Sequence, residues 1–161
     1  MANPTTRATE LSERGLVMAR VFNAPRELVF KVWTDPKHVI HWWGPTGFTN
    51  TIQEMDVRPG GKWKLIMHGP NGVDYPNVIS YEEVVKPERL VWSHGSDIPN
   101  DPGEFQVTVR FEDLGEKTRI TMEMLFKSAA AREKVVKEHG AIEGNKQTMD
   151  RLEAYLAKLS L

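Results

Sequence analysis

The sequence predicts an α+β domain in which a helix covers one face of an antiparallel sheet. Residues 105–111 alternate strictly between apolar and polar side chains, and residues 120–124 continue the pattern. This period of two is typical of strands that are buried on one face only. The chain then ends in an amphipathic helix, expected over residues 141–159. Such a helix can cover the apolar face of the sheet. Its apolar stripe comprises Ile142, Met149, Leu152, Leu156 and Leu159.

The bulk composition limits the possible classes of function. The chain has 161 residues, 40% of them apolar and 27% charged, with a net charge of −1, which predicts a soluble domain without a general attraction to nucleic acid or anionic lipid. The absence of cysteine excludes disulfides and thiolate metal sites. No stretch resembles a signal peptide or a membrane span. We therefore expect a cytoplasmic protein that inserts into no membrane, with a flexible N-terminus over residues 1–10 and a single domain over residues 11–161.

The first third of the chain is expected to form one strand and two short helices. The strand falls within residues 11–22, and the first helix starts at a proline, whose missing N–H is harmless in a first turn. Asp35-Pro36 ends that helix and begins a second one, expected to run to Trp42 or Trp43. Because adjacent residues on a helix cannot both point inward, at least one of these tryptophans should be partly exposed.

Six further strands are expected in the middle of the chain. Turns that contain glycine, proline, asparagine and aspartate separate most of them, as tight turns require. A short helix capped by Ser128 follows, and His139-Gly140 interrupts it before the long terminal helix. The expected strands cover residues 48–57, 62–68, 77–85, 89–94, 104–112 and 117–126, and residues 96–103 are expected to form a loop.

Seven segments of the chain form a specific set when they are taken together. They are F-N-A-P at 22–25, V-F-K-V-W-T-D-P at 29–36, H-W-W-G-P at 41–45, D-V-R-P-G-G at 56–61, P-E-R-L-V-W at 87–92, G-A-I-E-G at 140–144 and D-R-L-E-A-Y-L at 150–156. Over roughly residues 15–160 the chain resembles the branch of the START-like superfamily that is related to the C-terminal domain of the Hsp90 ATPase activator.

This resemblance implies a helix-grip fold, in which a curved antiparallel seven-stranded sheet wraps around the long C-terminal helix and leaves a cavity. Members of the superfamily bind sterols, lipids, plant hormones or polyketides, and a few catalyse cyclisation or dehydration. The branch has no shared catalytic residues. Because the chaperone activator also has a separate N-terminal domain that this chain lacks, we do not expect chaperone stimulation to be the main function.

Several bulky or adaptable side chains fall on the faces that would line such a cavity. Tryptophans bury large areas as core residues, or they line and gate a pocket, with the adjacent pair Trp42-Trp43 as the best gate. Methionines fill irregular core space, or they adapt a pocket to varied ligands. The candidate ligand-binding residues are Trp42, Trp43, Trp63, Met67, Tyr81, Trp92, His94, Val107, Met122, Gly144 and Thr148.

Polar chemistry is sparse, and we expect no metal, no cofactor and no catalytic residue. His38 and His41 have a spacing that can chelate a metal, but no third ligand accompanies them. No serine forms a recognisable triad with a histidine and an acid. His94 is in phase with Trp92 on its strand, so it could hydrogen-bond a hydroxyl or a carbonyl of a ligand, or act as an acid–base group.

The sequence therefore favours a module that binds a small apolar or amphipathic molecule between the sheet and the terminal helix. A cyclase or dehydratase acting in the same cavity is an alternative, which would need His94, Tyr81 or an acid inside it. A co-chaperone-like interaction domain is a third possibility. An exposed edge strand could also support a homodimer.

Overall fold

The computed structural model describes residues 13–95 and 104–159. The expected flexible N-terminus and the expected loop over residues 96–103 lie outside the described residues. The fold is α+β, as predicted, and all seven expected strands are present in one antiparallel sheet of order β1-β7-β6-β5-β4-β3-β2. The strands are β1 (Gly15–Phe22), β2 (Thr49–Met55), β3 (Lys62–His68), β4 (Asp74–Val85), β5 (Arg89–Gly95), β6 (Phe105–Asp113) and β7 (Thr118–Phe126).

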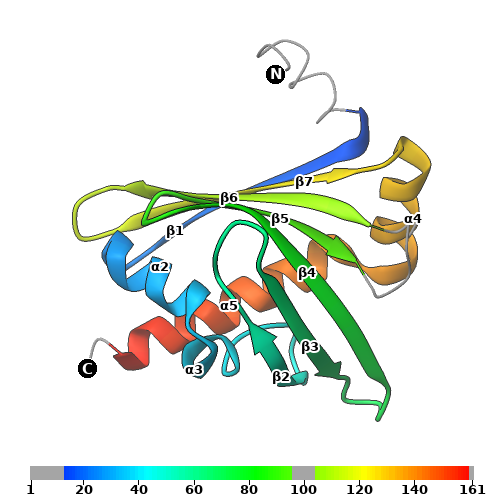
Figure 1. Cartoon of the computed structure of the whole chain (residues 1–161), viewed down its shortest axis with the longest axis horizontal. Coiled ribbons are helices and arrows are strands. Elements are labelled where there is room, and N and C mark those ends of the chain that lie inside the picture. The colour runs from blue at the N-terminus through cyan, green and yellow to red at the C-terminus, as the bar shows by residue number, and fades with distance from the viewer. Residues whose placement is uncertain (1–12, 96–103, 160–161) are drawn as a thin grey trace.

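The sheet curves around the long C-terminal helix, which confirms the helix-grip arrangement (Figure 1). Helix α5 crosses the concave side of the sheet, with α2 and α3 near its C-terminal end and α4 near its N-terminal end. The helices are α2 (Arg26–Thr34), α3 (Pro36–Val39), α4 (Ala129–His139) and α5 (Ala141–Leu159). Among the described residues, no helix combines the length and the apolar character that crossing a bilayer requires.

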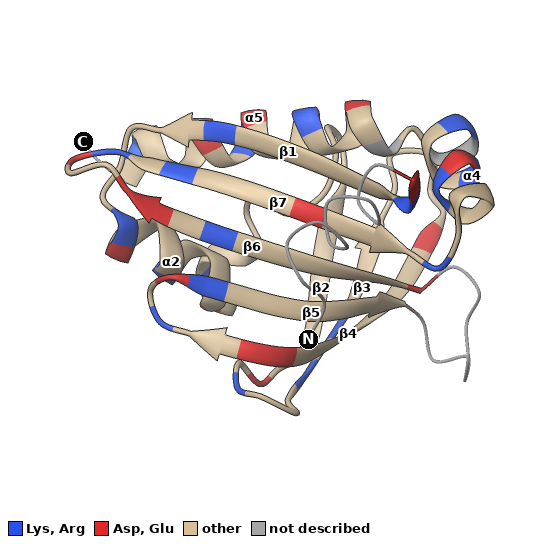
Figure 2. Cartoon of the chain, turned by 90° about the horizontal axis from the view of Figure 1, so that it is seen from above, with Lys and Arg blue, Asp and Glu red and all other residues tan. Residues whose placement is uncertain are grey.

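The two faces of the sheet have the expected opposite characters. Figure 2 views the sheet from its outer side and shows positively and negatively charged positions on the central strands β6 and β7. Cross-strand pairs such as Arg119 with Glu112, at 2.8 Å, lie on this face. The concave face carries the core instead, where Phe30 of α2 meets the edge of Phe111 of β6 with 5.3 Å between ring centroids. A ligand site within the fold would therefore lie on the concave face.

Helix α3 is shorter than predicted, and this corrects the expectation for the adjacent tryptophans. The helix ends at Val39, so Trp42 and Trp43 lie beyond it, where helical spacing no longer separates their side chains. Both are buried, with exposed fractions of 0% and 8%. The indole Nε1 of Trp42 donates a hydrogen bond to the carbonyl oxygen of Val32 at 3.0 Å. The prediction that one of the pair is partly exposed was therefore wrong.

The junction between the last two helices follows the sequence prediction. The Ser128 hydroxyl accepts a hydrogen bond from the backbone N–H of Ala131 and so caps α4. Gly140 ends α4 in the left-handed conformation, with φ 58°, which glycine adopts without steric penalty. The chain can therefore turn directly into α5, and this turn forms one wall of the pocket described next.

Candidate ligand pocket

A pocket of about 320 Å³ lies between the concave face of the sheet, the loop that follows α3 and the turn between α4 and α5. We call it the main pocket. Its described lining is mostly aromatic, thioether and small side chains. The lining residues are Trp33, Trp43, Gly44, Pro45, Met67, Trp92, His94, Phe105, Val107, Met122, Met124, Val135, Gly140, Gly144, Asn145, Thr148 and Met149.

Three tryptophans form the wall that separates the main pocket from the solid core. Trp33, Trp43 and Trp92 pack as a triangle, with 6.1–6.4 Å between each pair of ring centroids. Trp43 in turn packs edge-on against Trp63, with 4.7 Å between their ring centroids. Aromatic rings in such edge and tilted arrangements hold one another in place through their quadrupoles as well as their area. This wall is therefore the rigid side of the pocket.

The opposite side is built from residues that leave or yield space. Gly140 and Gly144 have no side chain where α4 turns into α5, and both line the pocket. A Cβ added at Gly144 would reach only ordinary contact with Pro45, at 3.6 Å. Met122 and Met124 face the pocket from β7 and have flexible thioethers that adapt to irregular shapes. The volume thus arises from missing and flexible side chains.

His94 is the titratable group in the described lining, and its surroundings keep it neutral. Its ring stacks on Phe105 with 5.0 Å between centroids and an interplanar angle of 19°. Its Nε2 is 2.9 Å from Oδ1 of Asn77. Burial disfavours the charged imidazolium and lowers the pKa of His94 to about 4. At neutral pH the pocket therefore contains an uncharged imidazole.

Two further polar side chains of the lining donate a hydrogen bond within the protein. The Thr148 hydroxyl donates to the carbonyl oxygen of Gly144 at 2.9 Å. The Asn145 amide Nδ2 donates to the thioether sulfur of Met122 at 3.4 Å. The side-chain oxygens of Thr148 and Asn145 remain available as acceptors, and the second N–H of the Asn145 amide remains available as a donor. No carboxylate or lysine is among the described lining residues.

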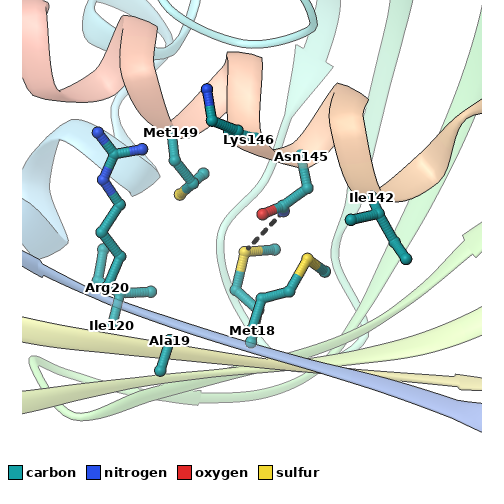
Figure 3. A pocket seen from close by; sticks show the side chains of 9 residues that line it. Met18, Ala19, Arg20, Ile120, Ile142, Asn145, Lys146 and Met149 are labelled. Atoms are coloured by element: carbon teal, nitrogen blue, oxygen red, sulfur yellow. Dashed lines mark hydrogen bonds between the residues drawn. The ribbon is translucent and has the colours of Figure 1, made fainter.

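A second, smaller pocket of about 200 Å³ adjoins the main one between α5 and the strands β1 and β7. Figure 3 shows Asn145 and Met149 pointing from α5 toward the strands, with Met18 below them on β1. Met122, Asn145 and Met149 line both pockets, so they form the partition between them. Arg20 also lines the second pocket, but Asp150 pairs with it at 2.8 Å.

Arg151 of α5 fixes the loop that carries Trp43. Its Nη1 donates to the carbonyl oxygens of Trp43, Gly44 and Pro45 at 2.9–3.1 Å, and its Nη2 donates to that of His41 at 3.3 Å. Partial burial lowers the pKa of Arg151. This role could not be expected from the sequence, because an arginine on an amphipathic helix usually faces water.

Most of the candidate residues surround the main pocket, but three do not. Trp43, Met67, Trp92, His94, Val107, Met122, Gly144 and Thr148 line it. Trp42, Trp63 and Tyr81 are absent from the lining and are at most 2% exposed, so they belong to the surrounding core. Burial also raises the pKa of Tyr81 above its ordinary value. The geometry gives these three residues no direct access to a guest.

The lining also includes residues that the sequence analysis did not nominate. Phe105 and Met124 are in phase with nominated neighbours on their strands, so alternation could have identified them. Trp33 lies on a helix whose orientation the pattern did not give. Asn145 and Met149 belong to the face of α5 that carries Thr148 and Leu152, and the apolar stripe could have indicated Met149.

The histidines that could have chelated a metal have other partners. Nδ1 of His38 is 2.6 Å from the hydroxyl of Tyr155, and the His41 ring stacks on the Tyr155 ring at 5.6 Å. Within the described ranges, no group of three histidine, aspartate or glutamate side chains could hold a metal ion.

Comparison with known proteins identifies a family and a set of similar folds. The family described as Activator of Hsp90 ATPase homolog 1-like protein matches residues 23–157, which confirms the resemblance seen in the sequence. No curated protein matches the chain.

Three solved structures illustrate the shared fold. A protein from Arthrobacter aurescens has a TM-score of 0.84 at 25% identity over 92% of this chain and 88% of that one. A protein from Mycobacterium smegmatis has a TM-score of 0.81 at 25% identity over 92% and 94%. The AHSA1 protein from Silicibacter pomeroyi has a TM-score of 0.72 at 22% identity over 89% and 97%.

Proposed function

The chain belongs to the Activator of Hsp90 ATPase homolog 1-like family, and on that premise we propose that it binds a small apolar or amphipathic molecule in the main pocket. The observation that carries the proposal is the volume of about 320 Å³ lined by aromatic rings, thioethers and glycines. Ligand pockets span about 300–1,000 Å³, so this one suits a small guest. In this proposal residues 11–161 act as one domain in the cytoplasm.

The expected affinity follows from the area that such a guest would bury. Roughly 200 Å² of apolar ligand surface contributes ~5 kcal/mol at about 25 cal/mol per Å² before the costs of association. A gain of this size corresponds to a Kd of roughly 0.2 mM before those costs, so apolar burial alone supports only weak binding. The flexible methionines of the lining favour tolerance of several guests over strict selection.

A pair of helix variants tests the proposal. Gly144→Leu places an isobutyl group at a position that lines the main pocket, whereas Ala157→Leu adds the same group on an exposed turn of the same helix. Titration with 2-naphthol, followed by tryptophan fluorescence and by calorimetry, should show saturable binding to the wild type and to Ala157→Leu. Gly144→Leu should bind at least tenfold more weakly. Equal binding by both variants, or no response from the wild type, would contradict the proposal.

An enzyme of the cyclase or dehydratase type is the second candidate, because the neutral imidazole of His94 lines the pocket and could accept a proton. The other two kinds of group that could have served this alternative are not in the described lining. Tyr81 lies outside the lining, and the described lining has no acid. Loss of a detected turnover in His94→Gln, with ligand binding retained, would support it. A co-chaperone role has no comparable observation in its favour among the described residues.

A further inference from the structure

We propose that the main pocket selects apolar alcohols or phenols over similar molecules whose polar atom can only accept a hydrogen bond. This inference rests on the proposed function and adds the polar chemistry of the guest. The sequence alone left open whether His94 would meet a hydroxyl or a carbonyl. The hydrogen bonds around His94 decide between them.

A short relay of hydrogen bonds fixes which nitrogen of His94 carries the proton. The Asn77 amide Nδ2 donates to the carbonyl oxygen of Tyr75 at 2.9 Å. The amide oxygen of Asn77 therefore faces Nε2 of His94, also at 2.9 Å. With the amide reversed, its oxygen would stand 2.9 Å from the Tyr75 carbonyl oxygen, and two acceptors would oppose each other. Nε2 of His94 must therefore be the donor in its contact with Asn77.

The other nitrogen of His94 is consequently a hydrogen-bond acceptor. A neutral imidazole that is protonated at Nε2 has a lone pair on Nδ1. Among the described residues, Nδ1 of His94 has no hydrogen-bond partner. His94 and the Phe105 ring on which it stacks both line the main pocket. A guest that presents an O–H or N–H group can supply the missing donor.

The other polar groups of the lining agree with this preference. Thr148 already donates to the carbonyl oxygen of Gly144 and so offers its oxygen as an acceptor, whereas the Asn145 amide, which uses one of its two N–H groups on Met122, can still donate or accept. The indole N–H groups of Trp33, Trp43 and Trp92, which all line the pocket, have no hydrogen-bond partner among the described residues, so the lining also contains donors that an oxygen of the guest can satisfy. A hydroxyl group is both donor and acceptor, and it fits such a lining better than a carbonyl or an ether oxygen does.

Two probes that differ by one methyl group separate a hydrogen bond from simple apolar burial. The first is 2-naphthol, and the second is 2-methoxynaphthalene, whose oxygen has no proton. Water solvates the hydroxyl better than the ether, so a purely apolar pocket would bind the ether more tightly. A hydrogen bond to Nδ1 of His94 should reverse that order and make the Kd of 2-naphthol roughly fivefold lower.

Variants then assign the preference to His94. In His94→Phe, which retains an aromatic ring but lacks the acceptor, 2-methoxynaphthalene should bind at least as tightly as 2-naphthol. In Tyr81→Phe, which removes a hydroxyl outside the lining, the wild-type preference should persist. Binding of both probes by the wild type without preference for 2-naphthol would overturn this inference and leave the proposed function standing. Binding of neither probe would overturn both.

A measurement on the unmodified protein keeps the inference testable if His94→Phe does not fold. Long-range proton–nitrogen correlation spectra distinguish the two neutral tautomers of a histidine from each other and from the imidazolium. At pH 7 the His94 signals should be those of the tautomer protonated at Nε2. The tautomer protonated at Nδ1, or a doubly protonated ring, would overturn the inference, because neither has a free acceptor on Nδ1.

Discussion

The two ends of the concave face use the same strands and the same helix, yet one is filled and the other is hollow. At the filled end, β6, β7 and α5 contribute Phe111, Thr118 and Leu152, which are almost completely buried. At the hollow end, the same three elements contribute Phe105, Met124 and Gly144 to the main pocket. The comparison indicates that the pocket results from side-chain choice along shared elements and not from a gap in the fold.

Large rigid aromatic rings fill one end, and flexible or missing side chains open the other. Trp33 lies at the boundary between the two ends. On the filled side its ring packs against that of Trp42 with 4.8 Å between centroids, and on the other side it lines the main pocket. Truncation should therefore have different consequences at the two ends. The filled end should lose stability, and the hollow end should lose or change binding.

The largest expected effect is the difference between two truncations, one at each end. Trp42 is completely buried, and its truncation to alanine leaves a cavity and removes the hydrogen bond to Val32, so we expect Trp42→Ala to cost about 3–5 kcal/mol. Met124 is only partly buried beside existing empty space, so Met124→Ala should cost about 1 kcal/mol. Urea denaturation of both variants measures the two losses. Equal losses would contradict the distinction between a filled and a hollow end.

The second prediction concerns the loss of folding stability at low pH that His94, a residue of the hollow end, should cause. The folded state holds the pKa of His94 near 4, below its ordinary value of 6.5. Between these values the unfolded chain binds a proton that the folded protein does not bind, so the free energy of unfolding falls as the pH is lowered. The loss is about 3 kcal/mol at most, and it is complete near pH 4.

Denaturation at pH 7 and at pH 4.5 tests this linkage. His94→Phe should lose less stability than the wild type over this interval, because its unfolded state has no proton to gain at position 94. His41→Phe removes an exposed histidine and serves as the matched control, in which the wild-type loss should persist. An unchanged pH dependence in His94→Phe would show that the imidazole is not held neutral by the pocket.

These contrasts also explain what the sequence could predict. Alternation with a period of two identifies which side chains face the helix, and it located all seven strands and much of the pocket lining. It does not say which end of the concave face a residue occupies. Trp63 and Tyr81 are in phase with the pocket strands, yet they belong to the filled part of the core. The site of Trp42 depends on the turn after α3, which follows no periodic pattern.

The third prediction concerns the loop between the two ends, which Arg151 holds to α5. Arg151→Met retains most of the apolar stem but removes the hydrogen bonds to the carbonyl oxygens of residues 41 and 43–45. We expect a loss of about 2 kcal/mol, because hydrogen bonds from a charged donor exceed neutral ones. The looser loop should also speed the release of 2-naphthol, as measured by stopped-flow fluorescence. Lys158→Met, on an exposed turn of the same helix, should change neither quantity.

The smallest expected effect separates the two glycines of the hollow end. Gly144 lies within α5 in a conformation open to any residue, and a Cβ there would meet Pro45 at an ordinary 3.6 Å. Gly144→Ala should therefore raise the free energy of unfolding by about 0.5–1 kcal/mol, because alanine favours a helix more than glycine does. Gly140 has φ 58°, so Gly140→Ala should lower it by about 1 kcal/mol through backbone strain, although a Cβ there would meet no atom within 4 Å. If urea denaturation gives a lower free energy of unfolding for Gly140→Ala and a higher one for Gly144→Ala, then the turn requires Gly140. Gly144 would instead keep a helix position small although alanine there would be more stable. A loss in both variants would contradict this, and would mean that the helix side of the hollow end has no room for even a methyl group.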